Sequence, residues 1–257
     1  MKYGFIGFGH LAQAIYQGLK NDQTISFAYI SKSNASKEIP SFKELSELVA
    51  FAQVIWLCVK PQDLGEVLTQ LKNIPLQDKL IVSPVAGKSI GFIENYLGKK
   101  VSIIRIMPNL AMAYKKSVTA FYTNNKKAIL VKRVKDDLGK LGKVVDLPEK
   151  HFDLFTAIFG SGPAFLLTIL QVFKNKISQL GLADRKADEL LVELAIGTLT
   201  YFQENRSHQN LDDLIRNITS KGGTTEAGLN YFKKNKLDKL LAKVIEAAKK
   251  RSKEIGK

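Results

Sequence analysis

The feature that most constrains the fold is a glycine-rich turn that follows an apolar run at the start of the chain. The run Tyr3–Ile6 has the length of a short buried strand and leads directly into Gly7-Phe8-Gly9-His10-Leu11-Ala12. After the turn, Leu11, Ile15 and Leu19 recur every four residues, which predicts the apolar face of a helix. A strand, a G-x-G-x-x-A turn and a helix in this order are typical of a dinucleotide-binding unit.

The small residues of this turn have separate roles. Gly7 permits a tight turn, Gly9 lets the backbone approach a pyrophosphate, and Ala12 lets the helix pack closely on the strand. The string alone is weak evidence because short motifs match often, but its setting between strand and helix favours dinucleotide binding.

The end of the second expected strand, 25–30, indicates which dinucleotide is bound. An NAD enzyme usually carries Asp or Glu there for the ribose 2′-hydroxyl. This chain has Ser31-Lys32-Ser33-Asn34 instead, and hydroxyls with a cation suit a 2′-phosphate. We therefore expect NADPH as the cofactor, with NADH bound more weakly. A solvated polar turn is the alternative interpretation.

The first half of the chain continues as alternating strands and helices, which predicts a parallel sheet covered on both faces. Ser41-Phe42-Lys43-Glu44 has a capping-box pattern that predicts a helix start. Ligands of such sheets bind beyond the carboxyl ends of the strands. Five loops are therefore expected to converge there: Gly7–Ala12, Ser31–Asn34, Lys60–Gln62, Ser83–Gly87 and Met107–Asn109.

No strand pattern remains after Pro148, and the rest of the chain reads as helices. We expect an α/β, Rossmann-like dinucleotide-binding domain at 1–148 and an all-helical dimerisation domain at 149–257. Gly160–Pro163 is predicted to be a turn, with the proline near a helix start. The many apolar residues in the helices predict a homodimer, or a higher homo-oligomer, built on this domain.

Composition excludes several classes of function. The formal charge is +15, but the lysines are scattered and no nucleic-acid-binding motif accompanies them, so specific nucleic-acid binding is not expected. Cys58 is the one cysteine, which rules out an intrachain disulfide, and no Cys/His spacing predicts a metal site.

No signal-peptide layout is present, and no apolar run approaches a membrane span. We expect a cytoplasmic protein without a membrane segment.

A second glycine-rich stretch, Ser220-Lys221-Gly222-Gly223-Thr224-Thr225, lies before an expected helix at about 225–235. Free N–H groups at a helix start form an anion site, and the threonine hydroxyls can point at a bound group. We expect a small anionic substrate there. The alternative is an ordinary loop with a threonine cap.

In combination, these motifs resemble the pyrroline-5-carboxylate reductase family. The resemblance is carried in the family's order, and over nearly the whole chain, by Gly4–Gly9, Val59-Lys60-Pro61-Gln62, Ala86-Gly87, Arg105-Ile106-Met107-Pro108-Asn109, Gly160–Ala164 and Gly222-Gly223-Thr224-Thr225. The first motif is generic, whereas the last three together are fairly specific.

The resemblance implies reduction of a cyclic C=N bond by hydride from NADPH, giving proline, with a helical domain that interleaves with its twin. Cofactor-binding residues would be Gly7, Phe8, Gly9, His10 and Leu11 at the pyrophosphate, Ser31 and Lys32 at the 2′-phosphate, Val59, Lys60, Pro61, Ala86 and Gly87 on the nicotinamide side, and Asn109. Ser220, Lys221, Gly222, Gly223 and Thr224 would bind the substrate carboxylate, and Thr225 would meet the ring nitrogen as the catalytic residue.

Departures from the family pattern leave other functions open. Lys221 stands where the family has proline, and Leu110-Ala111 replaces Thr-Pro. A divergent paralogue that acts on another imine or keto acid, or a non-catalytic regulator that binds a dinucleotide, is the alternative. The β-hydroxyacid dehydrogenases share the layout but need a lysine where this chain has Leu166.

Overall fold

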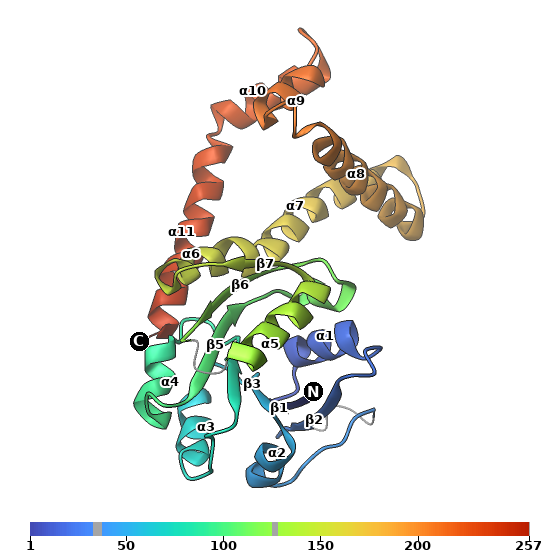
Figure 1. Ribbon diagram of the computed structural model, residues 1–257. Helices are drawn as coiled ribbons and strands as arrows, with labels where there is room; N and C mark the ends of the chain where they lie inside the picture. The colour runs from blue at the N-terminus through green and yellow to red at the C-terminus, as the bar shows by residue number, and fades with distance from the viewer. Residues whose placement is uncertain (33–37, 125–127, 257) are drawn as a thin grey trace. The chain divides into compact units, whose positions relative to one another are not determined.

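The computed structural model describes residues 1–32, 38–124 and 128–256. Its centre is a seven-stranded sheet with the order β2-β1-β3-β4-β5-β6-β7 (Figure 1). The strands are β1 (Lys2–Ile6), β2 (Ser26–Ile30), β3 (Val54–Leu57), β4 (Leu80–Ser83), β5 (Ser102–Met107), β6 (Ser117–Thr123) and β7 (Gly142–Asp146). The first five run parallel, and among the pairings of the described strands only that of β5 with β6 is antiparallel. This doubly wound order confirms the predicted fold class.

Helices cover both faces of the sheet (Figure 1). On one face lie α1 (His10–Leu19) and α5 (Ala128–Lys140), and on the other α2 (Leu45–Phe51), α3 (Leu64–Leu71) and α4 (Ile90–Leu97). The strand sequences explain this, because successive side chains point to opposite faces. Trp56 packs with the α1 side and Ile55 with the α2 side, and both are buried.

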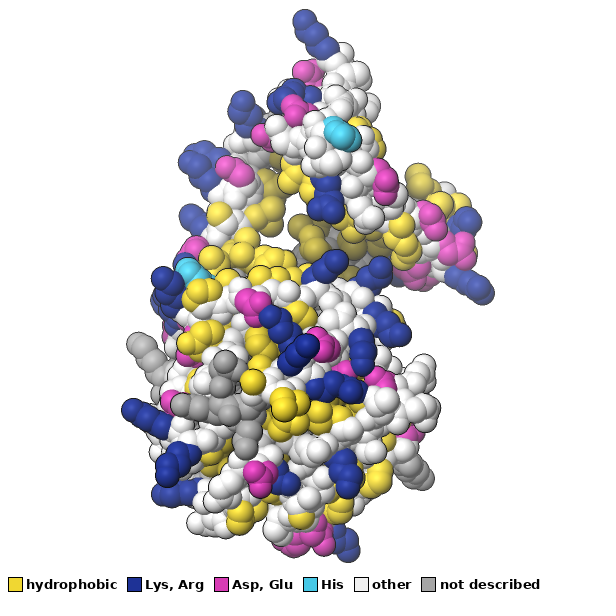
Figure 2. Space-filling model, viewed as in Figure 1, with side chains coloured by type: hydrophobic (Ala, Val, Ile, Leu, Met, Phe, Trp, Pro, Cys, Tyr) yellow, Lys and Arg dark blue, Asp and Glu magenta, His cyan; other side chains and the backbone are white. Residues whose placement is uncertain are grey.

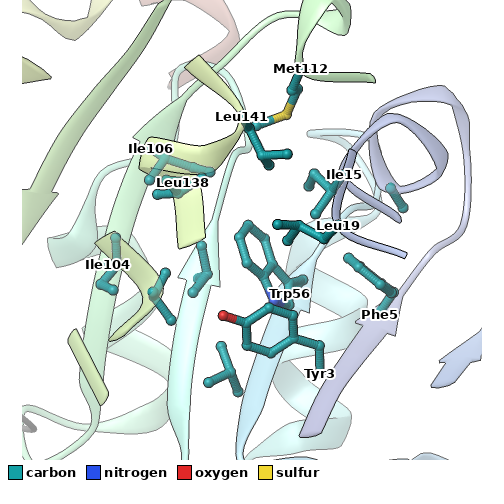
Figure 3. Close-up of a cluster of buried hydrophobic side chains, with 14 of the residues drawn as sticks. Tyr3, Phe5, Ile15, Leu19, Trp56, Ile104, Ile106, Met112, Leu138 and Leu141 are labelled. Atoms are coloured by element: carbon teal, nitrogen blue, oxygen red, sulfur yellow. The ribbon is translucent and has the colours of Figure 1, made fainter. Parts of the chain in front are cut away.

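The core on the α1 side is rich in aromatic rings (Figure 3). Tyr3 contacts Trp56 edge to face at a centroid distance of 5.5 Å, and Phe5 is 6.0 Å from the same indole ring. Leu19 of α1 and Leu138 of α5 close this cluster from above the sheet. Offset and edge-to-face rings add to the stabilisation that buried apolar area provides, so this cluster fixes the helices on the sheet.

The predicted cap of α2 is wrong by three residues. The helix begins at Leu45 with Glu44 as N-cap, and the Glu47 carboxylate accepts the Glu44 backbone N–H at 3.3 Å. Ser41 instead forms an isolated parallel bridge with Tyr29 of β2. Because this bridge keeps the chain at Ser41 extended, the helix starts one turn later than the sequence pattern predicts.

The remaining elements are almost all helical, as predicted. They are a 3₁₀ turn at Glu149–His151, α6 (Phe152–Phe155), a π-helical turn at Thr156–Gly160, α7 (Gly162–Ile177), a 3₁₀ turn at Ser178–Leu180, α8 (Asp184–Asn205), α9 (Leu211–Asn217), α10 (Thr224–Lys234) and α11 (Leu237–Gly256). Another 3₁₀ turn, Leu110–Tyr114, follows β5. No strand is present in the described chain after β7.

The predicted turn at Gly160–Pro163 does not interrupt the helix. The Ser161 N–H donates to the Thr156 carbonyl at 2.9 Å, which closes a π-helical turn, and α7 continues from Gly162. Pro163 sits at the second position of α7, where a missing N–H is tolerated. A proline and two glycines therefore change the winding of this segment without ending it.

By length and composition alone, the helical stretch Glu149–Leu180 could cross a membrane, because an 18-residue window within it has a mean hydropathy of 1.6. The expectation that no apolar segment approaches a span is therefore wrong, because the predicted turn at 160–163 divided this stretch. One such helix is weak evidence for a membrane, since core helices of other proteins share the same length and composition.

Two compact units make up the described chain. Unit 1 comprises residues 1–161 and 246–257, and unit 2 comprises 162–245. Unit 1 contains the sheet and its two cores. In unit 2 only Ala187 and Leu214 are buried among the described hydrophobic residues. The predicted boundary between residues 148 and 149 separates domains that fold independently, whereas the two units are defined by contacts within the folded chain. The domain boundary therefore stays a prediction.

Candidate active site

The carboxyl ends of β1 to β5 share one edge of the sheet, because these strands are parallel. All of the cofactor-binding residues predicted within the first 110 positions follow one of these ends. Gly7 to Leu11 follow β1, Ser31 and Lys32 follow β2, Val59 to Pro61 follow β3, Ala86 and Gly87 follow β4, and Asn109 follows β5. The fold therefore gathers them along one edge.

Gly7 joins the ends of three strands. Its N–H donates to the Ile30 carbonyl of β2 at 2.8 Å, and its φ of +85° favours glycine. A Cβ at Gly7 would lie 2.5 Å from the Cys58 carbonyl oxygen, directly after β3. Any larger residue here would displace one strand end from another, so Gly7 sets the geometry of the turn.

The start of α1 is open to an anion. Gly9 is its N-cap, no side chain caps the helix, and no acidic residue lies in its first turn. A Cβ at Gly9 would meet nothing within 4 Å. Within the described residues, the backbone N–H groups of His10 and Leu11 have no hydrogen-bond partner. Free N–H groups and the helix dipole together fit a phosphate.

The other residues of this turn have different environments. Phe8 is buried and stacks on Tyr29 at a centroid distance of 4.6 Å, so its backbone rather than its ring faces the turn. His10 is exposed. Leu11 is half-buried and packs against the aromatic core on the α1 side. Only backbone groups and the imidazole of this turn are thus available to a ligand.

Beyond β2, Ser31 is half-buried and the Lys32 side chain is 89% exposed. Lys32 Nζ lies 3.5 Å from Glu66 Oε2, but such an exposed ion pair contributes little to stability. The ammonium group can therefore leave Glu66 for a phosphate at little cost. Ser33 and Asn34, also predicted near this phosphate, lie outside the described residues.

The ends of β3 and β4 carry the residues predicted on the nicotinamide side. Val59 lies against the glycine turn, its Cγ1 being 3.1 Å from the position of a Gly7 Cβ. Lys60 is exposed and Pro61 half-buried. Ala86 packs against the cluster of Met107, Phe152 and Phe155. Gly87 has a φ of +75° and contacts the end of α11.

Asn109 connects the end of β5 to the π-helical turn. Its Nδ2 donates to the Phe159 carbonyl at 2.9 Å, and its Oδ1 accepts the Ala111 N–H at 3.1 Å. Phe159 lies four residues before Pro163, which has no N–H to offer that carbonyl. The structure thus gives the Asn109 side chain a role in packing, and its contact with a cofactor stays a prediction.

Sequence reasoning missed the role of Arg105. This arginine is buried within β5, and its Nη1 donates to Glu149 Oε1 at 2.9 Å. The same oxygen accepts the Ile90 N–H at the start of α4, at 2.8 Å. The guanidinium lies 4.6 Å from the Phe152 ring. A charged residue inside an apolar strand was the available signal, because a buried cation requires a partner.

The Gly-Gly-Thr-Thr turn of unit 2 has the geometry expected of a helix start. Gly222 has a φ of +75°, Gly223 is the N-cap of α10, and the Gly223 N–H donates to the Ser220 carbonyl at 3.0 Å. Within the part of the chain that is described, the N–H groups of Thr224 and Thr225 have no partner. Lys221 is exposed in the same turn.

Glu226 is a further residue of this turn that sequence reasoning missed. Its Oε2 accepts the Gly222 N–H at 2.7 Å. The sequence did contain a signal for this contact. Glu226 lies four residues after Gly222, so its side chain can reach back from the first turn of α10 to the Gly222 N–H. Of the residues predicted to bind the substrate carboxylate, Gly222 and Gly223 therefore have N–H groups with internal partners, whereas the Thr224 N–H remains open. The Thr225 N–H, which was not part of that prediction, is also open within the described chain.

These features are those of a dinucleotide-binding protein whose helical part contains a helix start with open N–H groups. No three His, Cys, Asp or Glu side chains gather to hold a metal ion among the residues that the structure describes. Curated relatives cover the whole chain. A pyrroline-5-carboxylate reductase from Staphylococcus haemolyticus is 32% identical over 100% of this chain and 98% of its own length. The chain belongs to the pyrroline-5-carboxylate reductase family.

Further comparisons agree with this assignment. Pyrroline-5-carboxylate reductase 2 from Bacillus subtilis is 30% identical over 99% of this chain and 95% of its own length. The model for pyrroline-5-carboxylate reductase dimerisation matches residues 149–255, and that for coenzyme F420-dependent NADP oxidoreductase matches residues 2–87.

Solved structures of the same family superpose over nearly the full length. Plasmodium falciparum pyrroline carboxylate reductase with NADP bound has a TM-score of 0.93 at 28% identity, and covers 100% of this chain and 98% of its own. The enzyme from Streptococcus pyogenes has a TM-score of 0.90 at 29% identity, with coverage of 99% and 98%.

Proposed function

We propose that this protein reduces 1-pyrroline-5-carboxylate to proline with NADPH, as a soluble cytoplasmic enzyme. The observation that carries the proposal is the match to reductases of this name over 98% of the length of one of them. The open N–H groups at the starts of α1 and α10 support it, because both the cofactor and the substrate are anionic.

NADPH, when bound, supplies the hydride. The N–H groups of His10 and Leu11, next to Gly9, hold the pyrophosphate at the start of α1. Ser31 and Lys32 hold the 2′-phosphate, a role that the 89% exposure of the Lys32 side chain permits. NADH lacks this phosphate and binds more weakly. Val59, Lys60, Pro61, Ala86, Gly87 and Asn109 complete the cofactor site.

The substrate carboxylate binds the turn before α10. The open N–H groups of Thr224 and Thr225 donate to it, Ser220, Gly222 and Gly223 shape the turn, and the Lys221 ammonium adds a positive charge. The Thr225 hydroxyl orients the ring nitrogen. A protonated C=N carbon accepts hydride more readily, because charge that develops on nitrogen is removed. Orientation and electrostatics are therefore the protein's contribution.

We further propose that the protein is a homodimer or a higher homo-oligomer built on residues 149–257, with the cofactor domain at 1–148. Unit 2 buries too little apolar surface to be stable alone. Its exposed side chains include Leu166 at 64%, Leu199 at 66% and Tyr231 at 68%. Figure 2 shows hydrophobic side chains at the surface of these helices. Such exposure marks an interface, which a molar mass from light scattering tests directly.

Thr225→Ala tests the proposed site. The variant is expected to lower kcat by about tenfold or more, since one oriented polar contact at the reacting nitrogen is lost. NADPH affinity stays unchanged. Thr198→Ala, on α8, is the matched control because its hydroxyl bonds only the Leu194 carbonyl within the described chain. Unchanged turnover by Thr225→Ala would remove Thr225 from the mechanism.

Lys221 favours one alternative, a related reductase for another imine or keto acid. Its side chain places a cation in the substrate turn, where the family has proline. A substrate with a second anionic group would gain from that charge. Comparison of kcat/KM for pyrroline-5-carboxylate and for a dicarboxylic imine, in the wild type and in Lys221→Pro, distinguishes the two functions.

A further inference from the structure

Two glycines that lie 169 positions apart in the sequence pack backbone to backbone in unit 1. Gly87 is in the loop after β4, and Gly256 is the last residue of α11. A Cβ added to Gly256 would lie 2.6 Å from the Gly87 carbonyl oxygen. A Cβ added to Gly87 would lie 2.7 Å from both the Gly256 nitrogen and the Ser252 carbonyl oxygen. Neither position can accept a side chain without a shift of the backbone.

Polar contacts hold the same two segments together. Lys88, which is buried, places its Nζ 3.5 Å from the Gly256 carbonyl and 4.4 Å from the Phe92 ring centroid. A cation at the end of a helix also interacts favourably with the helix dipole. One turn earlier, the buried Ser252 hydroxyl donates to Asp153 Oδ1 at 2.7 Å. The end of α11 is thus fixed both to the loop and to α6.

The place of this contact gives it a consequence for function. The loop follows β4, two strands from the Gly7 turn in the order β1-β3-β4. A dinucleotide bound along this edge passes the carboxyl end of β4. Ala86 packs against the cluster of Met107, Phe152 and Phe155, but Gly87, with its positive φ, has no side chain to hold its own backbone there. Its conformation therefore depends on what packs behind it.

We propose that the last turn of α11, Ser252–Gly256, is a positioning element for the cofactor loop Ala86–Gly87. This proposal rests on the proposed use of NADPH. The helix end holds the loop in the conformation that binds the nicotinamide side of the cofactor. Gly256 is required because only a residue without a side chain lets the two backbones touch. Lys88 and Ser252 act through the loop, and neither is a catalytic residue.

Gly256→Ala tests the proposal, with Gly139→Ala as the matched control. Both glycines lie near the end of a helix in unit 1, but a Cβ at Gly139 would meet nothing within 4 Å. We measure the NADPH dissociation constant by fluorescence, the melting temperature, and kcat at saturating NADPH. Gly256→Ala is expected to raise the NADPH dissociation constant and to lower kcat about tenfold, since displacements near 1 Å change reaction rates by this factor or more. Gly139→Ala leaves both the dissociation constant and kcat unchanged.

Lys88→Met provides a second test that introduces no steric clash. The thioether keeps the stem against Phe92 and removes the Nζ contact with Gly256. The expected rise in the dissociation constant is about fivefold, the effect of one lost hydrogen bond. Folded Gly256→Ala and Lys88→Met proteins that bind NADPH like the wild type would overturn the proposal. A wild type that does not bind NADPH at all would overturn both the proposal and the proposed function.

Discussion

The side-chain amide of Asn109 donates a hydrogen bond to the backbone carbonyl of Phe159, with an Nδ2–O distance of 2.9 Å. This bond connects the end of β5 to the π-helical turn Thr156–Gly160. The carbonyl is available because a proline four residues later has no N–H to donate. One asparagine therefore supplies a hydrogen bond that the helix backbone lacks and ties the π-helical turn to the end of β5.

Replacing Asn109 by alanine is expected to lower the free energy of unfolding by about 1–3 kcal/mol, the usual cost of leaving a partly buried carbonyl without its partner. Urea denaturation at a fixed protein concentration measures it. Asn73→Ala, at an exposed position, is the control. A loss below about 0.5 kcal/mol would show that water or a shifted residue replaces the amide.

A second prediction concerns alkaline pH. Burial, followed by the hydrogen bond from Tyr3 Oη to Asp137 Oδ2 at 2.6 Å, raises the pKa of Tyr3 above its ordinary value of about 10. The folded protein then holds the Tyr3 proton more tightly than the unfolded chain. Stability from neutral Tyr3 is fully present below about pH 10 and is lost as the pH rises further.

Melting temperatures of the wild type and of Tyr3→Phe, recorded from about pH 8 to about pH 11, test this. The wild type is expected to lose more stability over this range than the variant, because phenylalanine has no proton to lose. Other titrating groups are common to both proteins and cancel in the difference. Parallel curves would contradict the assignment of this pH dependence to Tyr3.

Charge reversal at Lys32 tests the cofactor preference. Lys32→Glu is expected to weaken NADPH binding by roughly tenfold or more, because a charge-assisted hydrogen bond to the 2′-phosphate is lost and a repulsion replaces it. NADH affinity should change little. Lys72→Glu, at an exposed position after α3, controls for the change in net charge. Equal effects on both cofactors would show that Lys32 does not contact the 2′-phosphate.

The substrate turn gives a further prediction. Because Glu226 holds the Gly222 N–H at 2.7 Å, Glu226→Ala is expected to loosen the turn and to raise KM for the substrate about fivefold, the effect of one hydrogen bond. Glu226→Gln keeps an acceptor and should change KM less, and NADPH affinity should stay the same in both. A lower KM in Glu226→Ala would instead indicate that Glu226 competes with the substrate carboxylate for Gly222.

Much of the strand-end site was predictable because local patterns specify it. Continuous apolar runs such as that of β3, which is buried throughout, predict a sheet covered on both faces, and the Gly7 and Gly222 turns predict backbone that only glycine adopts readily. The missed contact of Glu226 with Gly222 is local, but those of Lys88 and Asn109 are long-range. Nothing near Lys88 in the sequence indicates Gly256, and nothing near Asn109 indicates Phe159. The continuous helical path through 156–163 was predicted wrongly for a related reason. Asn109, which is distant in the sequence, donates to the Phe159 carbonyl the hydrogen bond that Pro163 cannot donate.

The central claim is that this chain reduces a cyclic imine with NADPH. Steady-state oxidation of NADPH, and of NADH in parallel, in the presence of pyrroline-5-carboxylate tests it most directly. The account predicts saturable turnover of at least about one per second, with a higher kcat/KM for NADPH than for NADH. Clear NADPH binding without turnover of pyrroline-5-carboxylate would contradict it and would favour a divergent paralogue.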